Sequence, residues 1–119
     1  MSYDLTLHNP DGSVVNLDHK HQLRGGTYDA GGTTEATLNV TYNYANLLDL
    51  VWPVVGIHVL EGLTALESVE VLTKGMLSIP WQPPDEDYWK STQGNVRAML
   101  SDLLVLACLV PPGSVWRVR

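Results

Sequence analysis

Positive charge is scarce in this sequence of 119 residues. Seven Lys and Arg stand against thirteen Asp and Glu, so the formal net charge is −6 and the isoelectric point about 4.9. Binding to nucleic-acid phosphates or to an anionic membrane surface needs a basic face, so the composition argues against both. An acidic protein can instead bind a basic protein partner or imitate a nucleic acid. Nucleic-acid mimics usually carry denser acid runs than the longest one here, Asp85-Glu86-Asp87.

Cysteine is nearly absent, and long apolar runs are missing. Cys108 alone cannot form an internal disulfide, which favours a reducing compartment. The first residues, MSYDLTLHN, lack the basic start and apolar run of a secretory signal, and the apolar run 103–110 is too short to span a bilayer. We therefore expect a cytoplasmic protein, with Cys108 buried and unreactive inside LLVLACLV.

Motifs for catalysis and cofactor binding are also lacking. There is no G-x-S-x-G elbow, and GGTYDAGGTTE is followed by a predicted strand rather than by the Lys-Ser/Thr and helix of a phosphate loop. His19 and His21 would share one face of a strand, but a metal site needs three or four ligands. We expect no catalytic residue, no cofactor and no metal.

A single domain over residues 1–119 fits the length and the 45% hydrophobic content. Its β-rich half is 1–44. In residues 3–8, Tyr3, Leu5 and Leu7 alternate with polar residues, and NPDG at 9–12 predicts a turn before a returning strand. Residues 34–42 form the clearest strand, which places Leu38, Val40 and Tyr42 on one face and Asn39, Thr41 and Asn43 on the other.

Helices dominate the half at 45–110. Pro53 means that a first helix either ends near Val51 or restarts at Pro53. TALE at 64–67 is a capping box for a helix over about 65–78, with Leu66, Val69, Leu72 and Met76 on its apolar stripe. A last helix, from Thr92 or Gly94 to Leu109, places Val96, Leu100, Leu103 and Ala107 in the core. Residues 111–119 contain a short final strand. These elements predict an α+β fold, with a small, mainly antiparallel sheet of about four strands and about three helices on one face.

Aromatic residues flank the acidic run in the Pro-rich segment 78–92, here called the aromatic loop. Trp81, Tyr88 and Trp89 combine a large apolar body with a polar group, a composition frequent in interaction surfaces. The alternative is a structural role, in which the tryptophans pack on the core and hold the loop against it.

Several motifs together resemble a family of small uncharacterised proteins from bacteriophages, prophages and mobile elements. They are RGGTYDAGGTTEATLNVTYNYA, GLTALES, DEDYWKSTQGN and the closing PPGSVW, which cover most of the chain from Arg24 to Trp116. The resemblance implies a phage-encoded accessory protein acting in a bacterial cytoplasm, and it implies no enzymatic activity. The polar residues that it singles out are Asn39, Thr41, Tyr42, Asn43, Tyr44, Tyr88, Trp89 and Asn95.

Two interpretations of these polar residues stay open. They form either a buried network that ties the chain together or a surface that binds a ligand or partner. We expect Asn39 and Asn43 to point to the same side of one strand and to reach the aromatic loop near Trp89 and Asn95.

The predicted function is binding. The protein would engage a host protein, for instance by inhibiting a defence or regulatory system. The alternatives are a structural or assembly protein of the virion and a protein that binds a small ligand or nucleotide. Because the last helix is apolar all round at its end, we also predict a homodimer or larger assembly.

Overall fold

The computed structural model describes residues 1–23 and 31–119, and within them the chain has five strands and three α-helices. The first glycine pair of the sequence, Gly25 and Gly26, lies outside these residues. The expected α+β class is confirmed: the strands form two antiparallel sheets, of three and of two strands. In the described parts of the chain, none of the helices is long and apolar enough to cross a membrane.

The main sheet is built from β1 (Ser2–His8), β4 (Thr37–Thr41) and β5 (Val115–Val118), in the order β4-β1-β5. Leu5 on the central strand pairs with Leu38 on one side and Val118 on the other, and all three are buried. The predicted alternation of β1 is confirmed, because Leu5 and Leu7 face the core while Asp4 is exposed. Trp116 of β5 is also fully buried.

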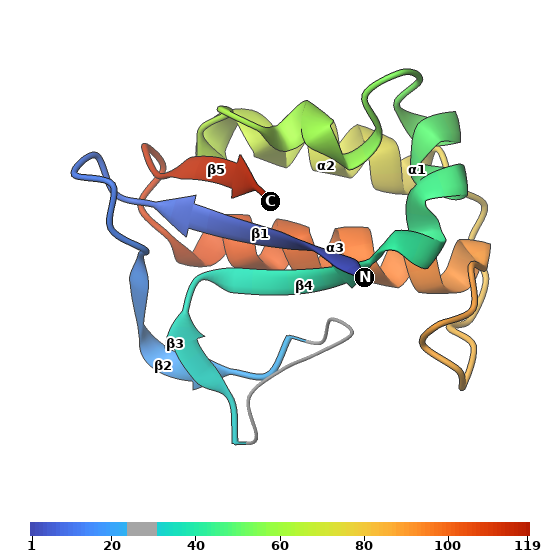
Figure 1. The fold of residues 1–119 in the computed structure, drawn as a ribbon, viewed down its shortest axis with the longest axis horizontal. Helices are drawn as coiled ribbons and strands as arrows, with labels where there is room; N and C mark the ends of the chain where they lie inside the picture. Colours follow the sequence, from blue (N-terminus) through green and yellow to red (C-terminus); the bar gives the residue numbers. More distant parts are fainter. Residues whose placement is uncertain (24–30) are drawn as a thin grey trace.

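The turn at 9–12 is confirmed, but the returning chain leaves the main sheet. Gly12 N–H donates to the Asn9 carbonyl at 2.9 Å, and only an isolated bridge from His8 to Val14 follows. The chain then forms β2 (Asn16–His21), which pairs with β3 (Thr33–Glu35) in the second sheet. This pair projects to one side of the main sheet (Figure 1).

The strand predicted over 34–42 is shorter and interrupted. It breaks at Ala36 between β3 and β4 and ends at Thr41, after which a 3₁₀ turn, η1 (Tyr42–Tyr44), leads into α1 (Ala45–Val51). The predicted faces are therefore wrong at this end: Thr41 is buried, whereas Tyr42 is 41% exposed and stacks on Tyr3 with ring centroids 4.4 Å apart. The helix end near Val51 is confirmed, and a second 3₁₀ segment, η2 (Gly56–Leu60), follows Pro53.

Two long helices, α2 (Ala65–Leu77) and α3 (Gln93–Leu109), lie on one face of the main sheet (Figure 1). The capping box of α2 is confirmed by reciprocal bonds between Thr64 and Glu67. The placement of Leu66 on the apolar stripe is wrong, because it is 67% exposed and Ala65 and Ser68 face inward instead. The buried Ser68 hydroxyl accepts the indole N–H of Trp116 at 2.8 Å, which joins α2 to β5.

The core stripe of α3 is confirmed, since Val96, Leu100, Leu103 and Ala107 are all buried. The prediction for Cys108 is wrong, because this cysteine is exposed. Successive helical residues are rotated by about 100°, so Cys108 turns away from the core when Ala107 faces it. Val105 and Leu109, 44% and 54% exposed, share this outer face.

Candidate functional site

The aromatic loop is held against α3 by the side-chain amide of Asn95, which is only 6% exposed. Its oxygen accepts the Asp85 N–H at 2.8 Å, and its nitrogen donates to the carbonyls of Asp87 and Lys90, both at 2.9 Å. An amide nitrogen has two protons to donate, and both are used. Three backbone groups of the loop are therefore fixed by one side chain of the helix.

Gly94, the residue before Asn95, is required by the close approach of the loop. A Cβ at this position would clash with the carbonyl oxygen of Pro83. Gly94 N–H also donates to the Gln82 side chain at 3.3 Å, and the Thr92 hydroxyl caps α3 by accepting the Asn95 N–H at 3.1 Å. The short sequence TQGN at 92–95 thus sets both the start of the helix and the position of the loop.

Tyr44 and Tyr88 join the same loop to the end of β4. The Tyr44 side chain is fully buried and its hydroxyl donates to the Tyr88 carbonyl. The Tyr88 hydroxyl accepts the Thr41 N–H at 3.3 Å, and the two tyrosine rings pack with centroids 5.5 Å apart. Trp89 packs edge-on against Tyr88 at 5.1 Å.

Asn43 reaches the loop as predicted, whereas Asn39 does not. The Asn43 amide donates to the Trp89 carbonyl at 2.9 Å. Asn39 instead donates to Ser2 and Asp4 on the open face of the main sheet, at 2.7 and 2.8 Å. The two residues are not on one strand, because β4 ends between them. Of the eight residues singled out by the resemblance, six therefore meet at the loop, and Asn39 and Tyr42 lie apart from it.

A pocket of about 160 Å³ opens between the aromatic loop and α3. Tyr44 contributes to its wall from η1, Pro84 and Tyr88 from the loop, and Met99 from α3. Its remaining lining residues are Asp85, Glu86, Asn95, Ala98 and Asp102. Aromatic, apolar and acidic groups from three separate segments thus surround one space, which is smaller than the roughly 300–1,000 Å³ of most small-molecule sites.

Asp102 is the unusual group of this pocket. Burial raises the pKa of its carboxyl to about 6, from an ordinary value of 3.8, and no hydrogen bond or charge offsets this burial within the described residues. Perturbed acids in pockets are frequent at functional sites. The sequence pattern did not identify Asp102, because one acid in the helical stretch SDLLVL is typical of a solvated face.

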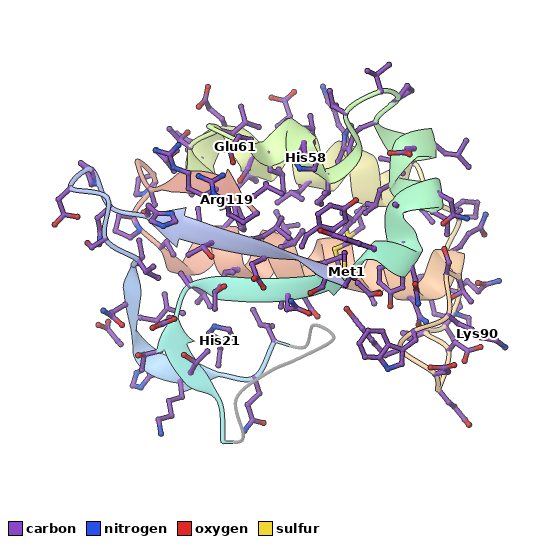
Figure 2. The ribbon with its side chains drawn as sticks, in the orientation of Figure 1. Met1, His21, His58, Glu61, Lys90 and Arg119 are labelled. Atoms are coloured by element: carbon purple, nitrogen blue, oxygen red, sulfur yellow. The ribbon has the colours of Figure 1, made fainter. Side chains whose placement is uncertain are left out.

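The acidic residues of the loop differ in their partners. Asp85 accepts the Asp87 N–H at 2.8 Å, and its other oxygen lies 3.7 Å from the Lys90 ammonium. Lys90 lies toward the opposite side of the molecule from Glu61 and Arg119 (Figure 2). Glu86 makes no hydrogen bond or ion pair within residues 1–23 and 31–119.

The other polar clusters have structural roles. His21 Nδ1 accepts the Leu23 N–H at 3.2 Å, so Nε2 carries the proton and donates to the Glu35 carbonyl at 2.7 Å, across β2 and β3. Glu61 and Arg119 point toward one another beside β5 (Figure 2). The Val118 N–H, donating to Glu61 at 2.6 Å, is the main cause of the lowered pKa of this carboxyl. Among the described residues, no group of three or more His, Cys, Asp or Glu is placed to hold a metal ion.

Comparison with protein-family models, with curated proteins and with solved structures finds no match to this chain.

We predict that Asn95→Ala lowers the free energy of unfolding by roughly 1–3 kcal/mol, because it leaves three backbone groups of the loop without their partner. Asn43→Ala, which removes one exposed bond, should cost about 1 kcal/mol or less. Urea denaturation followed by tryptophan fluorescence measures both. Equal stability of Asn95→Ala and the wild type would show that water replaces the amide, and that the loop is not held by it.

We predict that Asp102→Asn stabilises the protein at neutral pH. The raised pKa means that, between about pH 4 and 6, the folded state binds more protons than the unfolded state, so the stability of the wild type falls as pH rises through this window. The variant should therefore melt higher at pH 7.5, by on the order of 3–8 °C, and this gain should shrink as pH falls toward 4. Calorimetry at several pH values tests this.

The matched control for this experiment is Asp18→Asn, which makes the same change at an exposed position of β2. It should leave the melting temperature nearly unchanged at every pH. A gain for Asp102→Asn that does not depend on pH would contradict the assignment of the cost to the carboxylate.

Proposed function

We propose that this protein is a phage-encoded accessory protein that binds a host protein through the aromatic loop and the adjoining face of α3. The observation that carries the proposal is the exposure of Trp81 and Trp89, 73% and 49%, on a loop whose backbone is fixed by Asn95. Exposed aromatics are the residue type most enriched among binding hot spots. A loop that is already ordered loses little entropy on binding.

The surroundings of the loop support a protein partner over a nucleic acid. Asp85, Glu86 and Asp87 lie between the tryptophans, and the whole chain carries a net charge of −6. Such a surface attracts a basic patch on another protein and repels phosphates. The phage setting and the bacterial cytoplasm come from the sequence resemblance. Inhibition of a defence or regulatory system would follow if the bound host protein belongs to one.

A virion structural or assembly protein is the alternative. Its partner would be another virion protein, so the protein would be found in purified particles. Binding of a nucleotide has less support, because the pocket that contains Asp102 has no Lys, Arg or His among its described lining residues to hold phosphates. A second pocket beside the loop, lined by Trp81 and Gln82 among others, has one basic lining residue, Arg97.

We predict that Trp81→Ala weakens partner binding by at least roughly tenfold, the loss typical of a hot-spot aromatic. The partner would be captured from host lysate on the immobilised protein, identified by mass spectrometry, purified, and titrated against each variant by calorimetry. Leu66→Ala is the matched control, since it removes a comparably exposed apolar side chain at the opposite end of α2. Equal affinities for the wild type and Trp81→Ala would refute the assigned surface. Recovery of the protein mainly in virions would favour the alternative.

We further propose that the outer face of α3 mediates a homodimer, because Val105, Cys108 and Leu109 form an exposed, mostly apolar strip there. Sedimentation at micromolar concentration should give about twice the 13.1 kDa of one chain. Val105→Asp should give a single chain with an unchanged fold, because this side chain is already 44% exposed. A wild-type protein that sediments as one chain would overturn this proposal.

A further inference from the structure

The pocket between the aromatic loop and α3 contains more negative charge than its own residues neutralise. Three carboxylates line it, on Asp85, Glu86 and Asp102. Lys90 approaches only Asp85, at 3.7 Å, and no basic side chain is among the described lining residues. Two carboxylates are therefore left without a counter-charge, one on the loop and one on the helix.

The walls of the pocket are suited to an organic cation and not to a bare metal ion. The half-buried Tyr88 ring lines the pocket and is backed by the fully buried ring of Tyr44, with ring centroids 5.5 Å apart. Pro84 and Ala98 add accessible apolar surface. Tyrosine faces attract organic cations, and apolar walls cover the methylenes that carry them. A metal ion would need a cluster of ligands, and among the described residues His, Cys, Asp and Glu form none of three or more.

The size of the pocket limits the ligand to one side-chain head. Its volume is about 160 Å³, and a cavity of roughly 150 Å³ holds a benzene-sized molecule. A guanidinium or an ammonium group with one or two methylenes is of this size. An uncharged apolar group of the same size would leave the half-buried Asp102 carboxylate without compensation, which is costly.

We propose that this pocket binds a cationic side chain, the guanidinium of an arginine or the ammonium of a lysine, from the partner protein. Asp102 pairs with the charged head, Glu86 adds charge at the exposed side, and the Tyr88 ring contacts the cation and its methylenes. The inference rests on the proposed function, because it names the chemistry by which the aromatic loop recognises its partner. The Asn95 amide keeps the pocket formed before the ligand arrives.

Small probes test the pocket without the partner. Backbone amide spectra of ¹⁵N-labelled protein would be recorded during titration with N-acetyl-arginine methylamide, with its lysine counterpart, and with N-acetyl-citrulline methylamide, which is the neutral isostere of the arginine probe. We expect binding of a cationic probe on the order of millimolar, with shifts centred on Asn95, Ala98 and Asp102. The citrulline probe should bind at least roughly tenfold more weakly, since it lacks the charge-assisted contact.

Asp102→Asn should weaken the cationic probes by a similar factor while the protein stays folded, whereas Asp18→Asn should leave their affinity unchanged. If the arginine probe is favoured over the lysine probe, the ligand is a guanidinium; the reverse preference assigns an ammonium. The proposal would be overturned if the citrulline probe bound as tightly as the arginine probe, or if Asp102→Asn kept the wild-type affinity for the cationic probes. It would also be overturned if no probe shifted any amide signal.

Failure here and failure of the proposed function give different results. If no probe binds but Trp81→Ala still loses the partner, the pocket is wrong and the binding surface stands. If the cationic probes bind and depend on Asp102, while Trp81→Ala and Asp102→Asn both keep the wild-type affinity for the partner, the pocket is correct and the proposed surface is wrong.

Discussion

The side-chain amide of Asn95 supports the aromatic loop, and the site depends on that support. A loop with two exposed tryptophans and three neighbouring acids has little apolar burial of its own to hold it in one conformation. Asn95 compensates by bonding three of its backbone groups at 2.8 to 2.9 Å from a position that is itself nearly buried. Because both amide protons and the oxygen of Asn95 are used, any other conformation of the loop would leave polar groups unpaired. The pocket and the exposed tryptophans therefore have one defined geometry.

This support makes a poorly solvated acid tolerable at Asp102. A carboxylate whose pKa is raised by burial alone lowers stability at neutral pH. The loss is local, because the core beneath it is complete: Val96, Met99, Leu100 and Leu103 on the inner side of α3 are all buried. Natural proteins commonly keep such destabilising groups where binding needs them. Asp102 and Glu86 both lack a positively charged partner, so one bound cation would stabilise both carboxylates.

The sequence was sufficient wherever a local pattern decided the structure. The alternation in β1, the turn at 9–12, the capping box at Thr64 and the core stripe of α3 each depend on residues within a few positions of one another. It failed where distant residues decided. Thr41 was assigned to a polar face, yet it is buried beside Tyr88, 47 residues away. Cys108 was placed in the core because its neighbours are apolar, but composition does not reveal which side of a helix is covered.

Asp102 was missed for the same reason, since an acid on a helix is half-buried only when a loop from elsewhere lies over it. The hydrogen-bond partners of the polar residues bear on their two possible roles. Thr41, Tyr44, Asn43 and Asn95 use their hydrogen-bonding groups within the chain, and they act as ties. Asp102, Glu86 and the Trp81 ring make no such bond in the described residues. The first group holds the aromatic loop from β4, η1 and α3, and the second group lies on that loop and on α3 beside it. The partners of these polar residues favour the structural interpretation, and the groups without partners are the ones that we propose to meet a ligand.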